Sequence, residues 1–213
     1  MMKLAFTLMV LAVAGASAAQ LKVQQGTTES KSPDFCNGLD CPTFTVLKTT
    51  KEYSIRQYDV SKWVGTSEYS MDWSNSTTTM FWRLFRYISG QNQPKTKVAM
   101  TAPVLTKIVP GQGPACESNF TMHFFIPATE TNPPQPTDPK VSLSTLKSMK
   151  VYVRAFGGFP KEEIWTSEAQ KLAQAINDNS LFYSDFWFTA GYDGPSKIIN
   201  RHNEVWFVAK NDS

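Results

Sequence analysis

Hydrophobic side chains recur every three to four positions from Asp72 to Gly90, in the sequence DWSNSTTTMFWRLFRYISG. This spacing predicts an amphipathic helix with Asp72 or Ser74 as its N-cap and Gly90 as the residue that ends it. Trp82 and Arg86, four positions apart, are expected beside its core face, where a ring and a fixed positive charge suit a planar anionic ligand. The core face is expected to consist of Thr77, Phe81, Leu84, Phe85 and Ile88.

Short apolar or alternating runs around this helix predict β-strands. The link Thr49–Glu52 joins the first two runs into an expected hairpin. Pro103 cannot donate a backbone hydrogen bond, so it is expected to mark an edge or a bulge in the fourth. The strands expected in this part of the chain are Thr43–Lys48, Tyr53–Tyr58, Lys62–Tyr69, Lys97–Leu105 and Asn119–Ile126.

A proline-rich loop, Pro127–Pro139, separates this half from a second half with the same order of elements. A helix is expected over Lys161–Asn177, because its apolar residues form one stripe. Strands are expected at Lys150–Phe156, Phe186–Ala190 and Glu204–Ala209. Strand, helix, strand, strand therefore occurs twice, which predicts one α+β domain with a pseudo-twofold axis, a mainly antiparallel sheet or open barrel, and two helices packed on it.

The first residues have the pattern of a secretory leader. Lys3 precedes an almost wholly apolar run, Leu4–Gly15, and small residues follow at Ala16–Ala19. The run is too short to span a bilayer, so residues 1–19 are expected to be a signal peptide, with the mature chain starting near Ala19 or Gln20. We therefore expect a secreted, extracellular protein without membrane insertion.

Composition and net charge limit the classes of binding partner. The chain has 213 residues, 41% of them hydrophobic, which suffices for one domain with a sizeable core. It carries 21 Lys and Arg against 18 Asp and Glu, and loss of Lys3 with the leader leaves 20 against 18. This small, evenly spread charge argues against nucleic acid or an anionic membrane as a partner. Residues 20–42 are polar and lack periodicity, so we expect an irregular N-terminal arm there.

Three cysteines, Cys36, Cys41 and Cys116, allow one intrachain disulfide at most. All three pairings are open. A bond from Cys116 to Cys36 or Cys41 is favoured, because it would close a long loop and pin the arm to the domain. Two sequons, at Asn75 and Asn119, are expected to carry glycans in a secreted chain.

Four segments carry a resemblance to a known family. They are Ser61–Val64 (SKWV), Lys97–Val104 (KVAMTAPV), Val151–Gly158 (VYVRAFGG) and Gly191–Trp206 (GYDGPSKIINRHNEVW). In this order they resemble the SOUL family of haem-binding proteins, and the resemblance spans about residues 43–210. It implies a single domain of two βαββ halves that form a distorted, mainly antiparallel β-barrel flanked by two helices.

The resemblance also implies reversible binding of haem or another porphyrin in a shallow hydrophobic site on the first helix and on a late loop. Aromatic side chains would cover the porphyrin face, and two basic side chains would meet its propionates. The residues implied are Thr78, Phe81, Trp82, Phe85 and Arg86 on the helix and Lys197 on the loop. Some members carry a histidine, proposed as an iron ligand, where this chain has Gln57, so binding is expected to rest on the ring and propionate contacts without an axial ligand.

Simpler interpretations stand beside these roles. Phe81 and Phe85 also fit core packing, and Arg86 a surface ion pair. His202 is interpreted as a solvated turn residue and Met100 as a core residue. Asn200, Arg201 and Asn203 are interpreted mainly as structural residues of a turn.

Two other functional classes remain as alternatives to a porphyrin carrier. An enzyme is disfavoured, because the chain has no Gly-x-Ser-x-Gly, His-Glu-x-x-His or phosphate-binding glycine motif. A secreted glycoprotein that kept the fold for protein interaction and lost haem binding is the main alternative.

Overall fold

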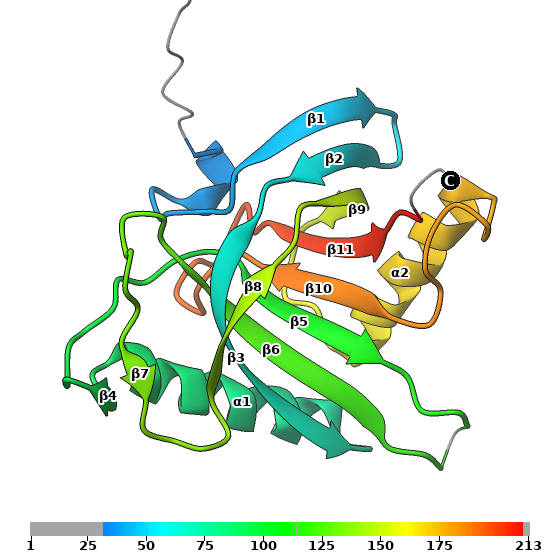
Figure 1. The fold of residues 1–213 in the computed structure, drawn as a ribbon. Coiled ribbons are helices and arrows are strands. Elements are labelled where there is room, and N and C mark those ends of the chain that lie inside the picture. The colour runs from blue at the N-terminus through cyan, green and yellow to red at the C-terminus, as the bar shows by residue number, and fades with distance from the viewer. Residues whose placement is uncertain (1–31, 114, 211–213) are drawn as a thin grey trace, which may run out of the picture.

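A computed structural model describes residues 32–113 and 115–210. Two helices, α1 (Trp73–Ile88) and α2 (Glu162–Ile176), pack on one nine-stranded antiparallel sheet that curls into a half-barrel (Figure 1). The strands of this sheet are β1 (Phe44–Thr49), β2 (Ser54–Tyr58), β3 (Ser61–Ser70), β5 (Val104–Val109), β6 (Ser118–Ile126), β8 (Ser142–Leu146), β9 (Met149–Phe156), β10 (Trp187–Gly191) and β11 (Asn203–Val208). A 3-10 turn, η1 (Asp34–Cys36), and a two-stranded ribbon of β4 (Asn92–Gln93) and β7 (Gln135–Pro136) complete the described part.

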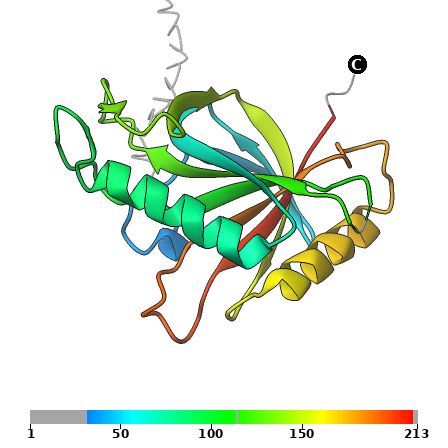
Figure 2. The ribbon, with the colours of Figure 1, turned by 90° about the horizontal axis from the view of Figure 1, so that it is seen from below.

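The order of strands confirms the predicted duplication. The sheet runs β1-β2-β9-β11-β10-β5-β6-β3-β8, so that β9-β11-β10 from one half meets β5-β6-β3 from the other. Each half inserts its last strand between the other two, and the halves join where β10 pairs with β5. The α+β class, the two βαββ halves and the two flanking helices are therefore as the sequence indicated. Figure 2 shows both helices on the same side of the sheet.

Each half also has an ion pair between its first strand and its helix, with the charges reversed. In the first half, Glu68 of β3 binds Arg83 of α1 at 2.6 Å. In the second, Arg154 of β9 binds Glu168 of α2 at 2.7 Å. The equivalent placement shows that the two halves share side-chain architecture as well as topology.

Helix α1 begins and ends where the sequence predicted. The Asp72 carboxylate accepts the Asn75 backbone N–H at 2.9 Å, and Gly90 takes a φ of 110° just after the helix. The predicted core face, however, is rotated. The buried side chains are Ser76, Met80, Arg83, Leu84, Tyr87 and Ile88, while Thr77, Phe81 and Phe85 are half-buried. The rotation accompanies the ion pair of Arg83 with Glu68. Because this pair places the Arg83 side chain on the buried face of the helix, Phe81 and Phe85 lie at the edge of that face.

The predicted strand at Lys97–Leu105 is wrong over most of its length. Residues 97–103 are irregular and strand β5 begins at Val104, directly after Pro103. The apolar pattern arises because Val98 is buried against α1 and donates its N–H to the Ile88 carbonyl. Met100 is 57% exposed, so its interpretation as a core residue is also wrong.

The favoured disulfide is wrong as well. Cys36 bonds to Cys41, and Cys116 is a free, exposed thiol. The arm meets the start of β5, where the Ala102 N–H donates to the Asp40 carbonyl, whereas Cys116 follows the end of that strand. A strand of this length holds its ends about 17 Å apart, far beyond the reach of a disulfide. The predicted signal peptide and residues 20–31 of the predicted arm lie outside the described residues.

Candidate functional site

Three aromatic side chains form a group on the outer flank of α1. The Phe81 and Phe85 rings stack with centroids 6.0 Å apart, and the Trp82 ring meets their edges at 5.7 and 5.5 Å. Phe81 also contacts Phe124 of β6 at 5.5 Å. Trp82 is 52% exposed. The group is therefore anchored on the sheet at its base and open to a ligand at its outer side, where Thr78 is exposed one turn before Trp82.

The sheet continues from this group as an open floor. Phe124 of β6 lies directly opposite Val104 of β5, and Val104 lies opposite Gly191 of β10. Directly opposed residues point to the same face, so this row lines the α1 side of the sheet over about 10 Å. A side chain added at Gly191 would meet no atom within 4 Å. The glycine thus leaves space within the row, between Val104 and the next residue of the row, Asn203 of β11.

Arg86 is the basic group nearest in sequence to the aromatic flank. It lies four residues after Trp82, in the last turn of α1, and it is exposed. Among the described residues its guanidinium pairs with no carboxylate, in contrast to the interpretation of Arg86 as a surface ion pair. Its five N–H donors are therefore available to an anionic group.

Lys197 has a different place. It lies in the loop between β10 and β11, where its ammonium binds the Asp193 carboxylate at 2.7 Å and the Asn37 side-chain oxygen at 2.9 Å. Burial alone would raise the pKa of Asp193, but the bonds from Lys197, the His202 N–H and Asn37 lower it. Lys197 thus ties the loop to the N-terminal arm, and none of its contacts is with α1. The role of Lys197 as a propionate ligand beside Arg86 therefore stays a prediction.

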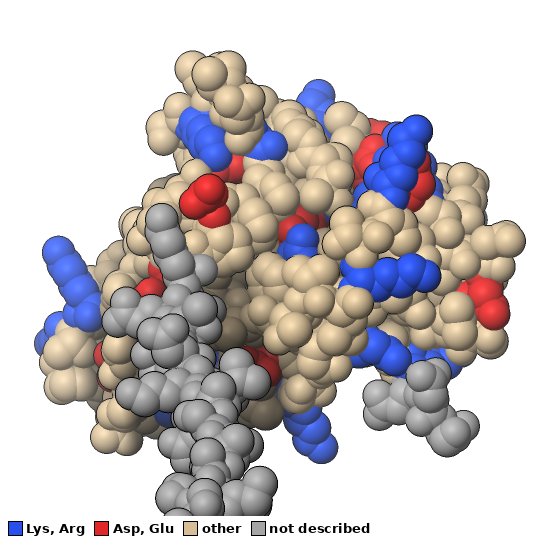
Figure 3. All heavy atoms as spheres, turned by 90° about the horizontal axis from the view of Figure 1, so that it is seen from above, with Lys and Arg blue, Asp and Glu red and all other residues tan. Residues whose placement is uncertain are grey.

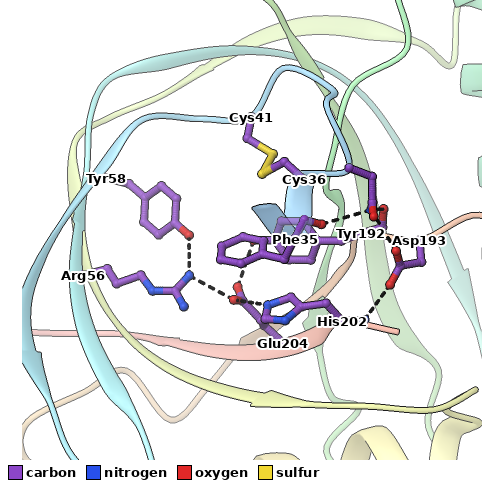
Figure 4. Close-up of a disulfide and its surroundings, with 10 residues drawn as sticks. Phe35, Cys36, Cys41, Arg56, Tyr58, Tyr192, Asp193, His202 and Glu204 are labelled. Carbon is purple, nitrogen blue, oxygen red and sulfur yellow. Dashed lines mark hydrogen bonds and ion pairs between the residues drawn. A yellow bond between two sulfur atoms is a disulfide. The ribbon is translucent and has the colours of Figure 1, made fainter. Parts of the chain in front are cut away.

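A buried polar cluster behind this loop escaped sequence analysis (Figure 4). The Glu204 carboxylate, 0% exposed, accepts hydrogen bonds from the Tyr192 hydroxyl at 2.9 Å and the Trp206 indole at 2.8 Å. It also binds the Arg56 guanidinium at 3.0 Å and the His202 ring at 2.7 Å. Burial disfavours the carboxylate, but His202, Arg56 and Trp206 hold the pKa of Glu204 below its ordinary value.

The N-terminal arm closes this cluster. The Phe35 ring stacks on His202 with centroids 4.2 Å apart, and the disulfide Cys36–Cys41 follows directly. His202 is therefore not a solvated turn residue. Since aromatic and disulfide groups cover the cluster and its carboxylate is fully bonded, it fixes the loop rather than receiving a ligand. Only the alternation of strand β11, which places Glu204 on an inward position, could have signalled this in the sequence.

Arg201 and Asn203 hold the same loop, as their interpretation as structural residues suggested. Both donate to the Gly158 carbonyl, each at 3.1 Å. Asn200 adopts a positive φ of 51°, which asparagine tolerates better than most residues. These residues hold the conformation of the turn.

No iron ligand is apparent among the described residues. Gln57 donates to the Ser148 hydroxyl at 2.8 Å. His123 points into the barrel, where burial lowers its pKa to about 4. Within residues 32–113 and 115–210 no three His, Cys, Asp or Glu side chains gather as a metal site.

The sequons at Asn75 and Asn119 differ in their surroundings. Asn75 is exposed in the first turn of α1, seven residues before Trp82 and thus about 10 Å away along the helix. Asn119 is half-buried, and its amide donates to the Tyr69 hydroxyl at 3.1 Å.

Charge and hydrophobic length add two observations. On the face shown in Figure 3, basic and acidic side chains are interspersed rather than gathered by sign. In the described part of the chain, neither helix is long and apolar enough to cross a membrane.

Known proteins are similar to this chain in sequence or in fold. The family model of the SOUL heme-binding protein matches residues 39–208. Heme-binding protein 2 of Homo sapiens is 40% identical over 162 residues, which cover 75% of this chain and 79% of that protein. Heme-binding protein 1 of Xenopus laevis is 30% identical, covering 73% and 83%. The crystal structure of the EcmrR C-terminal domain matches with a TM-score of 0.58 at 10% identity, covering 75% of this chain and 97% of that one, and shows a shared fold.

Proposed function

The chain belongs to the SOUL heme-binding protein family, and on that premise we propose that it binds haem or another porphyrin reversibly on the flank of α1. The relatives that it resembles are named as heme-binding proteins. The bound porphyrin would lie against Phe81, Trp82 and Phe85, with its edge over the row of Phe124, Val104 and Gly191. Burial of one ring face against these aromatic groups supplies the affinity, at about 25 cal/mol per Å² of apolar surface.

The basic residues Arg86 and Lys197 have different roles in this proposal. Arg86 has unpaired donors and meets a propionate through charge-assisted hydrogen bonds. Lys197 is bonded to Asp193 and Asn37, so we assign it to the position of the loop. Thr78 borders the site one turn before Trp82. Binding rests on ring and propionate contacts and uses no axial ligand from the residues described.

One observation carries this proposal: the helix that bears the exposed Trp82 and Arg86 rests through Phe81 on Phe124, and from Phe124 a row of paired strand residues leads to the open position at Gly191. Exposed aromatic groups of this kind on a folded protein mark binding surfaces more often than they occur without a role. The row Phe124, Val104 and Gly191 gives this group a flat floor, as a planar ligand requires.

We further propose that the protein acts as a secreted carrier and not as an enzyme. The leader-like N-terminus supports export, and the bond between Cys36 and Cys41 is of the kind that persists in oxidising compartments. The polar cluster that most resembles a catalytic set, around Glu204, is buried under Phe35 and has no room for a substrate.

Titration with haemin tests the proposal. We expect a saturable shift of the Soret band together with quenching of tryptophan fluorescence, because Trp82 lies in the site. Arg86→Ala should weaken binding about tenfold through loss of a charge-assisted contact. Lys48→Ala, which removes an exposed charge from β1 at the opposite edge of the sheet from β3 and β8, serves as the control. A titration without saturation would refute the carrier function.

The alternative, a secreted glycoprotein of the same fold that lost haem binding and acts in protein interaction, rests on Asn75. A glycan there would stand on the same exposed face of α1 as Trp82, two turns away. Enzymatic removal of the glycan separates the two functions. If haemin binds only after the glycan is removed, the interaction function is favoured.

A further inference from the structure

Two neighbouring loops carry some of the most exposed apolar side chains of the described residues. Ile198 and Ile199 are 76% and 74% exposed in the loop between β10 and β11, and Phe159 is 55% exposed in the loop between β9 and α2. Arg201 connects the loops, because it donates to the Gly158 carbonyl and its guanidinium lies 4.2 Å from the Phe159 ring. Figure 2 shows both loops, orange and yellow, projecting from the same end of the molecule. We call Phe159, Ile198 and Ile199 the loop tip.

From this arrangement we propose that the loop tip inserts into the surface of a phospholipid bilayer. The side chains stand on projecting turns, a shape that enters a soft interface. Burial of large apolar side chains in the interfacial region stabilises such attachment without any membrane-spanning segment. Net charge led us to expect no membrane partner. That argument takes no account of apolar side chains at the ends of loops.

The backbone of the tip suits a medium that offers few hydrogen bonds. In lipid, an unpaired backbone carbonyl is costly. The Arg201 guanidinium donates to the carbonyls of Gly194 at 2.6 Å, Lys197 at 2.8 Å and Asp193 at 2.9 Å, in addition to that of Gly158. The Arg201 guanidinium therefore donates hydrogen bonds to four carbonyls of the two loops. These carbonyls stay hydrogen-bonded when the tip leaves water.

The charges around the tip favour lipid headgroups only in part. Lys197 and Arg201 lie behind the isoleucines, and the one acid of the loop, Asp193, has a fully buried side chain paired with Lys197. Glu162 and Glu163, however, are exposed in the first turn of α2, close to Phe159 in sequence. Apolar insertion is thus expected to dominate, with a modest gain from anionic lipid.

The loop that bears Ile198 and Ile199 begins at Gly191, the end of the proposed porphyrin floor. Insertion of the tip would hold that floor close to a bilayer, the phase in which an apolar porphyrin dissolves. Collection of porphyrin from lipid is the use we infer for the tip, and this use, unlike the attachment itself, rests on the proposed function.

Vesicle co-sedimentation without haemin tests the attachment alone. Protein purified from the medium of a eukaryotic host is mixed with vesicles of phosphatidylcholine, with or without phosphatidylserine. The double variant Ile198→Ser and Ile199→Ser should bind about tenfold more weakly for each isoleucine removed. The matched control is Val46→Ser with Leu47→Ser, an adjacent pair of similar type on β1 that is 50% and 54% exposed. Circular dichroism checks that all variants fold.

Three results would overturn the proposal. The first is no binding to either vesicle, which leaves haemin binding in solution untouched. The second is an equal loss in both double variants, or none. The third is a dimer in size-exclusion chromatography that the isoleucine variant abolishes, because the tip would then bind a second copy of the chain. Loss of binding in the isoleucine variant alone supports insertion of the tip.

Discussion

The two halves of the sheet share strand order, helix placement and a strand-to-helix ion pair, yet they differ on the outer side of their helices. Helix α1 exposes Trp82 beside Phe81 and Phe85, and its Arg86 pairs with no carboxylate of residues 32–113 and 115–210. On α2, the exposed cation Lys171 instead binds Glu168 at 2.6 Å. Duplication therefore accounts for the scaffold, and the porphyrin site that we propose belongs to the first copy.

The interiors of the halves differ too. The first half turns His123 of β6 inward, with a buried ring nitrogen, Nδ1, that has no partner in the described residues. The second turns Glu204 of β11 inward and surrounds it with four partners. Loss of a partner destabilises the fold where a buried charge such as the Glu204 carboxylate is left unpaired. Protonation destabilises it where a buried imidazole such as that of His123 has no partner for the added charge.

The largest effect is expected from Glu204→Ala. It leaves the Arg56 guanidinium buried without its carboxylate, which typically costs about 3–5 kcal/mol in the free energy of unfolding. Urea denaturation measures this loss. Glu163→Ala, an exposed acid of the same half, is the control and should change stability by less than about 0.5 kcal/mol. Similar values for the two variants would show that the cluster does not hold the second half.

The interior of the first half should show in the pH dependence of stability. The unfolded chain protonates His123 below its ordinary pKa of 6.5, whereas the folded protein keeps it neutral down to about 4. The free energy of unfolding should therefore fall by about 3 kcal/mol as pH drops through that window.

Denaturation at several pH values, with His123→Gln as the comparison, measures this effect. The variant lacks the titrating ring, so its stability should change less between pH 6.5 and about 4. Parallel curves for the two proteins would mean that His123 is not the group responsible.

The outer sides of the helices are compared by Trp82→Ala and Ile164→Ala, which remove exposed apolar side chains from α1 and α2. Haemin affinity should fall about tenfold in the first variant, because an aromatic face no longer covers the ring. It should not change in the second. An equal loss in both would place the ligand elsewhere or on both helices.

The smallest effect is expected from Asn75→Gln. A glycan attached there begins about 10 Å from Trp82, so its loss should change haemin affinity by no more than about twofold. Mass spectrometry establishes occupancy in the parent protein. A large gain in affinity would show that the sugar covers the site.

Local periodicity was enough to predict the duplicated order of strands and helices and the ends of α1, since these depend on caps and patterns within a few residues. It was not enough for the direction of the α1 core face, which depends on Arg83 meeting Glu68 fifteen residues away. The disulfide prediction was wrong for a similar reason. The length of β5 separates Cys116 from Cys36, and the sequence alone does not show that the arm lies at the other end of that strand.

Of the candidate site, the aromatic flank and Arg86 followed from helical spacing together with the family resemblance. The open position at Gly191 did not, because it depends on which strands become neighbours. The resemblance assigned Lys197 to the ligand, and its bonds to Asp193 and Asn37 could not be predicted, because these partners come together only in the folded chain.

The most direct test of the porphyrin site is a haemin titration of Gly191→Val beside Gly194→Val. Both glycines have open space where a side chain would stand, and neither has a positive φ, so both variants should fold. Valine at position 191 fills the end of the floor and should weaken haemin binding about tenfold or more, while valine at position 194 should leave it unchanged. Equal affinity in the two variants would contradict a site on the flank of α1.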